Sequence, residues 1–279
     1  ILLTSDSSAI KFGAGADATL THTNDVGITL NSTNKLMFND ASQFIQGSSA
    51  TVLSLGATDE IDLTATAVDL NGTLTISGDT TLETGADIIT ATAGNNNTRI
   101  GVNAGFSIQS GGNGNTCLGE EAGRSLTTGD NNVAIGYEAL YYEDAHGQNI
   151  AIGYRALKNQ NGGAEVANTA IGYLAGSNID LGRENVLVGA NVGDSLTHAD
   201  YNVAIGNGSL GADTLGHKST AVGYATLNAQ NFTSSTDTFN TAVGYFAGVS
   251  MTTGTLNTLI GGHAGDSLTD ADLNVAVGF

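Results

Sequence analysis

Acidic side chains are the first residues in this sequence whose type and spacing could support catalysis. The densest acidic group is Asp59, Glu60 and Asp62. Paired carboxylates can hydrolyse glycosidic bonds, but they must converge, and sugar clefts also use exposed aromatic rings. The acids of this chain are scattered through predicted turns, and Trp is absent. We therefore interpret the group as a solvated strand edge and expect no enzyme activity and no catalytic residues, with a glycan-degrading β-solenoid enzyme as the weaker alternative.

Histidines could bind a metal ion, but their spacing argues against it. The five are His22, His146, His198, His217 and His263. No two lie close in sequence, so we predict no transition-metal site within one chain and no cofactor. Three chains around an axis could each contribute one His. Calcium would suit the many Asp and Asn residues in turns, but no EF-hand loop or Gly-Gly-x-Gly-x-Asp array is present, so we expect a solvated face there.

From residue 97 onward the sequence repeats the motif Asn-(Thr/Val)-Ala-(Ile/Val)-Gly. The fold of this repeat therefore decides where the acidic and histidine side chains of this region lie. Its marker glycines are Gly101, Gly119, Gly136, Gly153, Gly172, Gly189, Gly206, Gly223, Gly244, Gly261 and Gly278. Their successive intervals are 18, 17, 17, 19, 17, 17, 17, 21, 17 and 17 residues. A period this short, with few helix signals, predicts that each repeat is one coil of a stacked parallel β structure.

Each slot of the repeat has its own requirement. The residue before the marker glycine is always Ile, Leu or Val, and we predict that it is the inward core position, with the Ala that usually precedes it lining the same side. Asn occupies the slot four before the glycine in ten of eleven copies, Ser219 being the exception. Stacked Asn side chains predict an amide ladder along the coils. The constant glycine predicts a positive φ or a close backbone approach.

Cysteine and tyrosine are the other side chains of the repeat region that could react or contact a ligand. Cys117 occupies the Ala slot, so we predict a small buried hydrophobe and not a nucleophile. Tyr often follows the marker glycine, where packing between coils or chains explains it at least as well as a ligand-binding stripe. Tyr141 and Tyr142 interrupt the register, and they are our candidates for receptor contact, on a loop or a helical turn.

Residues 1–93 read differently, as short alternating strands separated by Asn, Asp, Gly and Ser. Examples are 9–12, 26–30, 51–55, 61–64, 67–70 and 74–76. Such strands are too short and too narrow on their apolar side to fold as an isolated sheet, so we predict a β-rich shaft in which three chains intertwine. The Gly-Asn run 92–97 marks the boundary. We therefore divide the chain into a shaft (1–93) and a repeat β-roll (94–279).

The amino-acid composition and net charge limit the kinds of partner that the chain could bind. The chain has 279 residues with 39 Gly and no Pro, and 8 Lys+Arg against 27 Asp+Glu give a net charge of −19. Nucleic acid would be repelled, so it is excluded as a partner. Three chains would carry 3 × −19 = −57, which favours solubility in a saline, extracellular setting. No apolar stretch approaches bilayer length, so we expect no membrane insertion. The first residues, Ile-Leu-Leu, and the last repeat, cut at Phe279, predict a piece of a longer protein.

Two segments carry a resemblance to known families. Residues 97–279, most clearly Asn-Thr-Ala-Ile-Gly-Tyr-Leu-Ala-Gly at 168–176, resemble repeats of long viral tail-fibre proteins. They are also similar to head domains of trimeric autotransporter adhesins, which implies a left-handed parallel β-roll in a trimer. The first 90 residues resemble the tail-fibre shafts of marine bacteriophages, and residues 57–72 carry this resemblance.

Together these features predict an all-β, fibrous homotrimer, with an intertwined β shaft followed by a parallel β-roll or β-solenoid of about 17-residue coils. The expected role is a virion tail fibre or receptor-binding fibre, a rigid spacer for host attachment in the extracellular space. Its partners would be other fibre or baseplate proteins and a host surface receptor or glycan. A bacterial trimeric surface adhesin is the alternative.

Overall fold

The structure, a computed structural model, consists of strands and turns. It describes 9–12, 18–23, 27–30, 36–38, 40–49, 52–56, Ile61, 94–163 and 166–279. These residues contain no helix. Contacts divide the chain into two units, 1–81 and 82–279.

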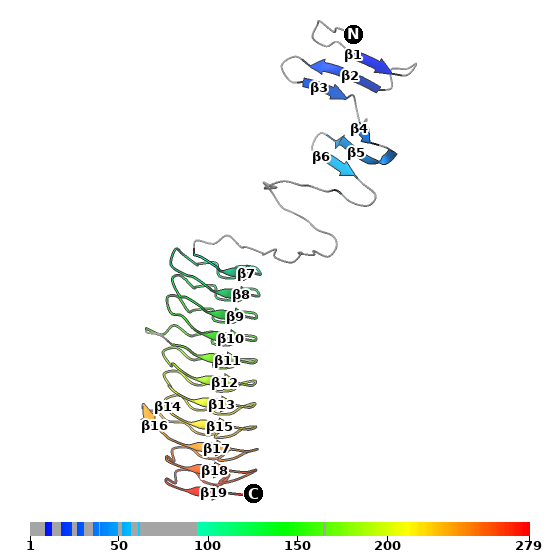
Figure 1. Cartoon of the computed structure of the whole chain (residues 1–279). Coiled ribbons are helices and arrows are strands. Elements are labelled where there is room, and N and C mark those ends of the chain that lie inside the picture. The colour runs from blue at the N-terminus through cyan, green and yellow to red at the C-terminus, as the bar shows by residue number, and fades with distance from the viewer. Residues whose placement is uncertain are drawn as a thin grey trace. The chain divides into compact units, whose positions relative to one another are not determined.

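The first unit holds two antiparallel sheets of three strands each, with orders β1-β2-β3 and β4-β5-β6 (Figure 1). The strands are β1 (Ala9–Phe12), β2 (Ala18–Thr23), β3 (Gly27–Leu30), β4 (Leu36–Phe38), β5 (Asp40–Ser49) and β6 (Val52–Gly56). Strands were predicted at the positions of β1, β3 and β6. The strands expected at 61–64, 67–70 and 74–76 lie outside the described residues, apart from Ile61, and the intertwining of three chains stays a prediction.

The second unit is a parallel β-solenoid, as the repeat predicts. Eleven three-residue strands pair in parallel, each with the equivalent strand of the next repeat, so one repeat is one coil (Figure 1). They are β7 (Thr98–Ile100), β8 (Thr116–Leu118), β9 (Val133–Ile135), β10 (Ile150–Ile152), β11 (Thr169–Ile171), β12 (Val186–Val188), β13 (Val203–Ile205), β15 (Thr220–Val222), β17 (Thr241–Val243), β18 (Thr258–Ile260) and β19 (Val275–Val277). We number coils 1 to 10 by their marker glycines, from Gly101 to Gly261.

The direction of the strand side chains corrects one prediction. The Ala in the middle of most strands is the inward residue, and it is fully buried in β9, β10, β11, β13, β15 and β17. The Ile, Leu or Val before the marker glycine faces outward, with Ile171 38% and Ile205 39% exposed. The prediction of an inward branched residue was wrong, because adjacent residues of a strand point to opposite faces.

Leucine fills the interior in two alternative ways. Some coils have Gly four residues after the marker glycine and a large apolar residue three later, as in Gly123 and Leu126. Others have Leu in the first slot and a buried polar residue in the second, as in Leu140 and Glu143. A Cβ on Gly123 would lie 2.8 Å from Leu126 Cδ1, so both slots cannot be large. We call these Gly-type and Leu-type coils.

The two coil types alternate in pairs along the stack. Coils 1, 2, 5, 6, 9 and 10 are Gly-type, and coils 3, 4, 7 and 8 are Leu-type. Four coils therefore form a larger repeat of 70 to 72 residues. The two longest intervals, 19 and 21 residues, both belong to the second coil of a Leu-type pair. In coil 8 the extra residues form β16 (Thr236–Asp237), which pairs with β14 (Gly216–His217) beside the stack (Figure 1).

An asparagine ladder joins successive coils, as the sequence predicts. The Oδ1 of each ladder Asn accepts the backbone N–H of the ladder residue in the next coil at 2.8–3.0 Å. In most of these residues Nδ2 also donates to a corner carbonyl of the next coil, as from Asn202 to Gly216 at 2.9 Å. At Ser219 the ladder continues through Thr238 of the coil 8 insertion, whose Oγ1 lies 2.6 Å from Ser219 Oγ.

The marker glycines satisfy both conditions that the sequence implies. Gly136 has φ +125°, and a Cβ there would lie 2.6 Å from the carbonyl oxygen of Gly153 in the next coil. The other ten also have φ between +125° and +143°. Glycine is thus required by the backbone conformation and by the close stacking of neighbouring coils.

Candidate recognition surfaces of the solenoid

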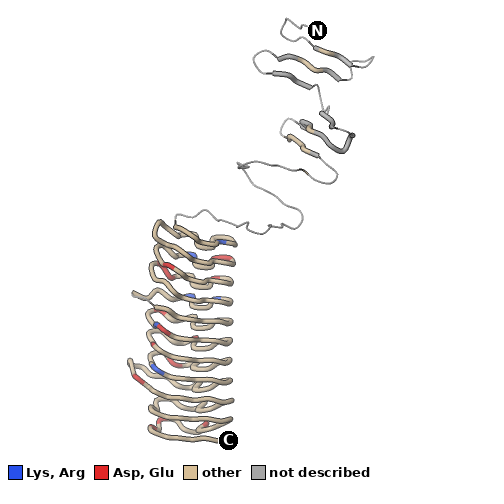
Figure 2. The backbone as a smooth tube through the Cα atoms, in the orientation of Figure 1, with Lys and Arg blue, Asp and Glu red and all other residues tan. Residues whose placement is uncertain are grey.

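The outward face of the eleven-stranded sheet carries no charged side chain. Two residues of each strand point outward, the first and the third, and all of them are Thr, Val, Ile or Leu. The third residues form one continuous column. They are Ile100, Leu118, Ile135, Ile152, Ile171, Val188, Ile205, Val222, Val243, Ile260 and Val277. Figure 2 shows acidic and basic residues at many other places along the turns of the stack. In a chain of net charge −19, this uncharged column is the clearest candidate contact surface.

Tyrosines that follow the marker glycine form stacked columns. Tyr137, Tyr154 and Tyr173 stack with ring centroids 5.4 and 5.2 Å apart and interplanar angles of 13° and 11°. Tyr224 and Tyr245 stack in the same way at 5.4 Å. Stacking on a neighbouring tyrosine covers at least one face of each ring, and the faces are the surfaces that a sugar ring would contact. Packing between coils therefore accounts for these tyrosines.

The predicted receptor contacts, Tyr141 and Tyr142, lie together on a corner of coil 3 without helical structure. Their rings pack edge to face with centroids 4.6 Å apart. Tyr141 is half-buried, and Arg124 and Lys158 from the adjacent coils place their cationic groups 5.5 and 5.7 Å from its ring centroid. Tyr142 is 49% exposed, so it is the member of the pair that a partner could reach. Receptor contact through this pair stays a prediction.

The cations near this corner are already paired. Nε of Arg155 and Nζ of Lys158 each lie 2.7 Å from Oε2 of Glu138. Burial of Glu138 opposes its ionisation, but the hydrogen bonds from Lys158 and Arg155 outweigh it and lower the pKa of this carboxyl. Both cations are therefore held by one carboxylate, which balances only one of their two positive charges.

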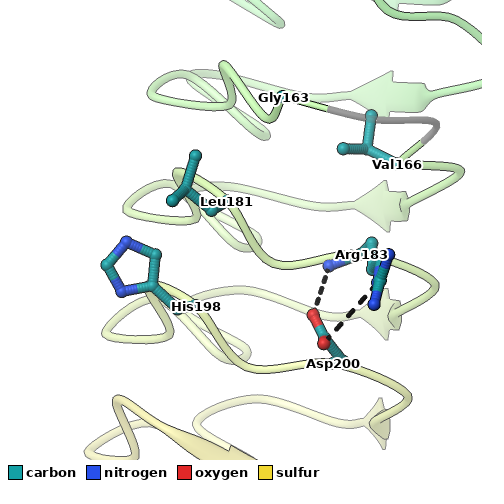
Figure 3. A pocket seen from close by; sticks show the side chains of 6 residues that line it. All are labelled: Gly163, Val166, Leu181, Arg183, His198 and Asp200. Carbon is teal, nitrogen blue, oxygen red and sulfur yellow. Dashed lines mark hydrogen bonds and ion pairs between the residues drawn. The ribbon is translucent and has the colours of Figure 1, made fainter.

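A depression of about 460 Å³ lies on a different corner, across coils 4 to 6 (Figure 3). It is lined by Gly163, Val166, Leu181, Arg183, His198 and Asp200. The backbone N–H of Arg183 donates to Oδ1 of Asp200 at 3.0 Å, and its guanidinium lies 3.7 Å from Oδ2 (Figure 3). Because the guanidinium is paired, the described residues that line the depression offer no free Arg or Lys, and they bring together no pair of groups poised for acid–base chemistry.

One group of side chains resembles a hydrolytic triad but has the wrong proton arrangement. Nε2 of His217 lies 2.7 Å from Oγ of Ser235, and Nδ1 lies 3.8 Å from Oδ2 of Asp200. The backbone N–H of Asp200 donates to Nδ1 at 2.9 Å. Nδ1 is therefore the acceptor, Nε2 carries the proton, and His217 cannot take a proton from Ser235. The contact instead fastens the coil 8 insertion to the stack.

Cys117 is fully buried in the inward Ala slot, as predicted. Burial raises the pKa of its thiol to about 11, and the nearby Arg99 lowers it by a smaller amount. A buried, protonated thiol is a poor nucleophile, so this residue is part of the core.

The remaining site predictions have mixed outcomes. The acidic group Asp59, Glu60 and Asp62 lies outside the described residues, as does the side chain of His22. Sequence reasoning missed the corner of coil 3 where Glu143, Asp144 and His146 come together, with one potential ligand atom of each within 4.8 Å of the others. The search for paired histidines overlooked it, although the Glu-Asp-x-His run could have revealed it.

Glu143 is the least ordinary member of this group. Its side chain is fully buried, and burial raises the pKa of its carboxyl, opposed by hydrogen bonds from His146. A buried carboxylate needs partners for both oxygens.

In comparisons with known proteins, no family model, no curated protein and no solved structure matches the chain. Among the described residues, no helix has the length and apolar character to cross a bilayer.

Proposed function

We propose that this chain is a structural segment of a trimeric attachment fibre of a virion, in which it serves as a rigid spacer. The observation that carries the proposal is the uncharged outward column that runs the whole length of the stack. Such a surface is costly to leave in water, and along it chains of charge −19 could approach one another without opposing acids.

A second and third copy of the chain fit this face better than an unrelated partner. Every copy repeats the same branched side chains once per coil, at the strand spacing of about 4.8 Å. Columns of equal period can interdigitate along the full stack, whereas a partner without that period would match only locally. Three copies around one axis would bury every column.

Stiffness follows from the same coils. The asparagine ladder, the parallel strand pairing and the continuous core all act between adjacent coils, so bending must stretch many hydrogen bonds together. The proposed partners are other fibre or baseplate proteins along the axis and a host surface receptor or glycan, which the exposed Tyr142 corner could contact. A bacterial trimeric surface adhesin would use the same rod, and a membrane anchor encoded downstream would favour it.

Imaging of the purified chain tests the proposal. Negative-stain images should show rods in which the solenoid part is about 48 Å long, from ten intervals of about 4.8 Å, with three-lobed end views. Glycan incubation should give binding or no effect, without release of reducing ends. Single thin rods would contradict the trimer, and saccharide turnover would favour the enzyme alternative.

A further inference from the structure

Four buried polar residues occupy the second core slot of the Leu-type coils, and one of them is incompletely paired. In Asp213, Oδ1 accepts the N–H groups of Gly216 and Phe232, both at 3.1 Å, and Oδ2 accepts from Gln230 at 2.6 Å. Gln160 donates to a backbone carbonyl at 2.9 Å and accepts from a ladder Asn at 2.6 Å. The slot thus normally satisfies both ends of a polar side chain.

Glu143 departs from this arrangement. Its Oε1 accepts the backbone N–H groups of Asp144 at 3.1 Å and His146 at 3.0 Å. Its Oε2 is buried and has no hydrogen-bond partner among the described residues. Burying half of a carboxylate without a donor is unfavourable, and a cation beside the group would compensate it.

His146 also differs from the residues at the equivalent position of other coils. It stands ten residues after its marker glycine, where the other 17-residue coils carry only small residues. These are Gly129, Gly182, Ala199, Gly216, Gly254 and Ala271. The imidazole at this slot places Nδ1 2.9 Å from Oε1 of Glu143 and 3.9 Å from Oδ1 of Asp144. The Glu, the Asp and the His therefore converge from a single tight corner.

We propose that Glu143, Asp144 and His146 bind one divalent transition-metal ion of the zinc class. One imidazole nitrogen with two carboxylates is a donor set for zinc and similar borderline cations, whereas calcium and magnesium prefer oxygen alone. Ligand atoms about 3.3 Å apart would surround a tetrahedral ion at about 2.0 Å. The 2.9 Å separation of His146 from Glu143 would have to widen, and the half-exposed Asp144 would have to close its 3.9 Å separation from His146.

The corner is accessible to an ion and to a water ligand. The side chains of His146 and Asp144 are 21% and 50% exposed, so these two proposed ligands are open to solvent, whereas Glu143 is buried. A cavity of about 230 Å³ adjoins His146 and is lined also by Thr128 and Asp130. Metal binding would brace the corner that carries Tyr142, because both belong to the same turn of coil 3.

Zinc titration of the full chain by calorimetry tests the site, with three variants. E143Q places in coil 3 the residue that coils 4 and 8 carry in this slot, and H146G restores the small residue of other coils. H198A is the matched control, because His198 also lies beside an acid, 3.8 Å from Asp180. We expect one zinc per chain for the wild type and H198A, and about tenfold or greater weakening in E143Q and H146G. Zinc should raise the unfolding temperature only in the chains that bind it.

Unchanged zinc affinity in H146G or E143Q would overturn the proposal, as would the absence of saturable binding to the wild type at millimolar zinc. X-ray absorption of the zinc-loaded wild type gives a readout that does not depend on the folding of variants. A first shell with an imidazole nitrogen supports the site, and a shell of oxygen alone contradicts it.

Discussion

The marker glycines are the positions of the coil at which no residue other than glycine fits. Gly136 combines φ +125° with a neighbouring backbone that a Cβ would meet at 2.6 Å. Either condition disfavours an L side chain, and a shift away from the contact would separate coils that the ladder holds together.

A Gly136→Ala substitution should therefore lower the free energy of unfolding by about 2 kcal/mol or more, from backbone strain and overpacking. Gly163→Ala is the control, because nothing lies within 4 Å of a Cβ there and its φ is outside the left-handed range. Chemical denaturation followed by circular dichroism measures both. Equal effects of the two substitutions would contradict the close-stacking explanation.

The buried Glu143 predicts a pH dependence of stability. Because burial raises the pKa of this carboxyl in the folded state, the folded chain holds the proton more tightly than the unfolded chain. Its contribution to stability is therefore present at low pH and is lost as the pH rises from the unfolded value of about 4.3 through the folded one.

Comparison of the wild type with E143Q isolates this contribution in metal-free buffer. The free energy of unfolding of E143Q relative to the wild type should increase from pH 4 to pH 8, because Gln has no proton to lose. A difference that stays constant, or that falls with pH, would show that Glu143 is not protonated more readily in the folded chain.

At the scale of elements, the coil has two interchangeable cores. The four Leu residues of the Leu-type coils have φ between +48° and +51°, a left-handed conformation that costs an L residue about 1 kcal/mol or more. The Gly-type coil avoids this strain and fills the same space from the second slot. Either core packs well only when both slots are of the same coil type, so a change in one slot requires a change in the other.

A double-mutant cycle in coil 3 tests this coupling. L140G alone should destabilise by about 3 kcal/mol through loss of a buried side chain, and E143L alone by about 1–3 kcal/mol through overpacking against Leu140. The L140G/E143L pair recreates a Gly-type coil and should recover most of the loss. Measured unfolding free energies that simply add would contradict the exchange of cores.

The asparagine ladder predicts a second element-scale effect. Asn202→Ala removes the acceptor of the Ser219 N–H and the donor to the Gly216 carbonyl, both of which are buried. Thermal unfolding should show a loss of about 2–4 kcal/mol, from two unpaired backbone groups. Asn207→Ala is the control at an exposed slot. A similar small effect of both substitutions would mean that the ladder adds little to stability.

Much of this element was predictable from the repeat. The constant spacing predicted one coil per repeat, the recurring Asn predicted the amide ladder, and the constant glycine predicted the close approach of neighbouring backbones. Which strand residues point inward was predicted wrongly. A strand of three residues is too short to show an alternating pattern of apolar and polar residues, and the larger Ile appeared a better core residue than Ala. The interior is in fact filled largely by Leu, Ile and Met side chains from the turns, so Ala suffices on most strands, with the inward Leu187 and Leu259 as larger exceptions.

The same reasoning missed the corner of coil 3. Glu143 is buried only because Leu140 precedes it in a Leu-type coil, and that pairing of slots becomes clear when the coils are stacked. His146 was judged by its distance from other histidines, whereas its potential partners are the carboxylates two and three residues before it.

At the scale of the whole molecule, the uncharged outward face sets the expected assembly. Eleven branched side chains, many of them about 40% exposed, would contribute on the order of 10 kcal/mol if buried between copies, before the cost of association. Repulsion between chains of charge −19 opposes this gain, so added salt should favour assembly.

A single glutamate on the column should disrupt that assembly. Ile205→Glu places a charge on the face in the middle of the stack, where burial without a partner would cost several kcal/mol. Leu181→Glu is the matched control, because Leu181 is similarly exposed but lies on a corner away from the strands. Circular dichroism should show that both variants keep the strand content of the wild type.

Sedimentation equilibrium of the wild-type chain and these two variants tests the central claim most directly. The account predicts a mass of three times 28.1 kDa for the wild type and for Leu181→Glu, and a mass of 28.1 kDa for Ile205→Glu. A wild-type chain that sediments as a monomer at micromolar concentration, or an Ile205→Glu variant that stays trimeric, would contradict it.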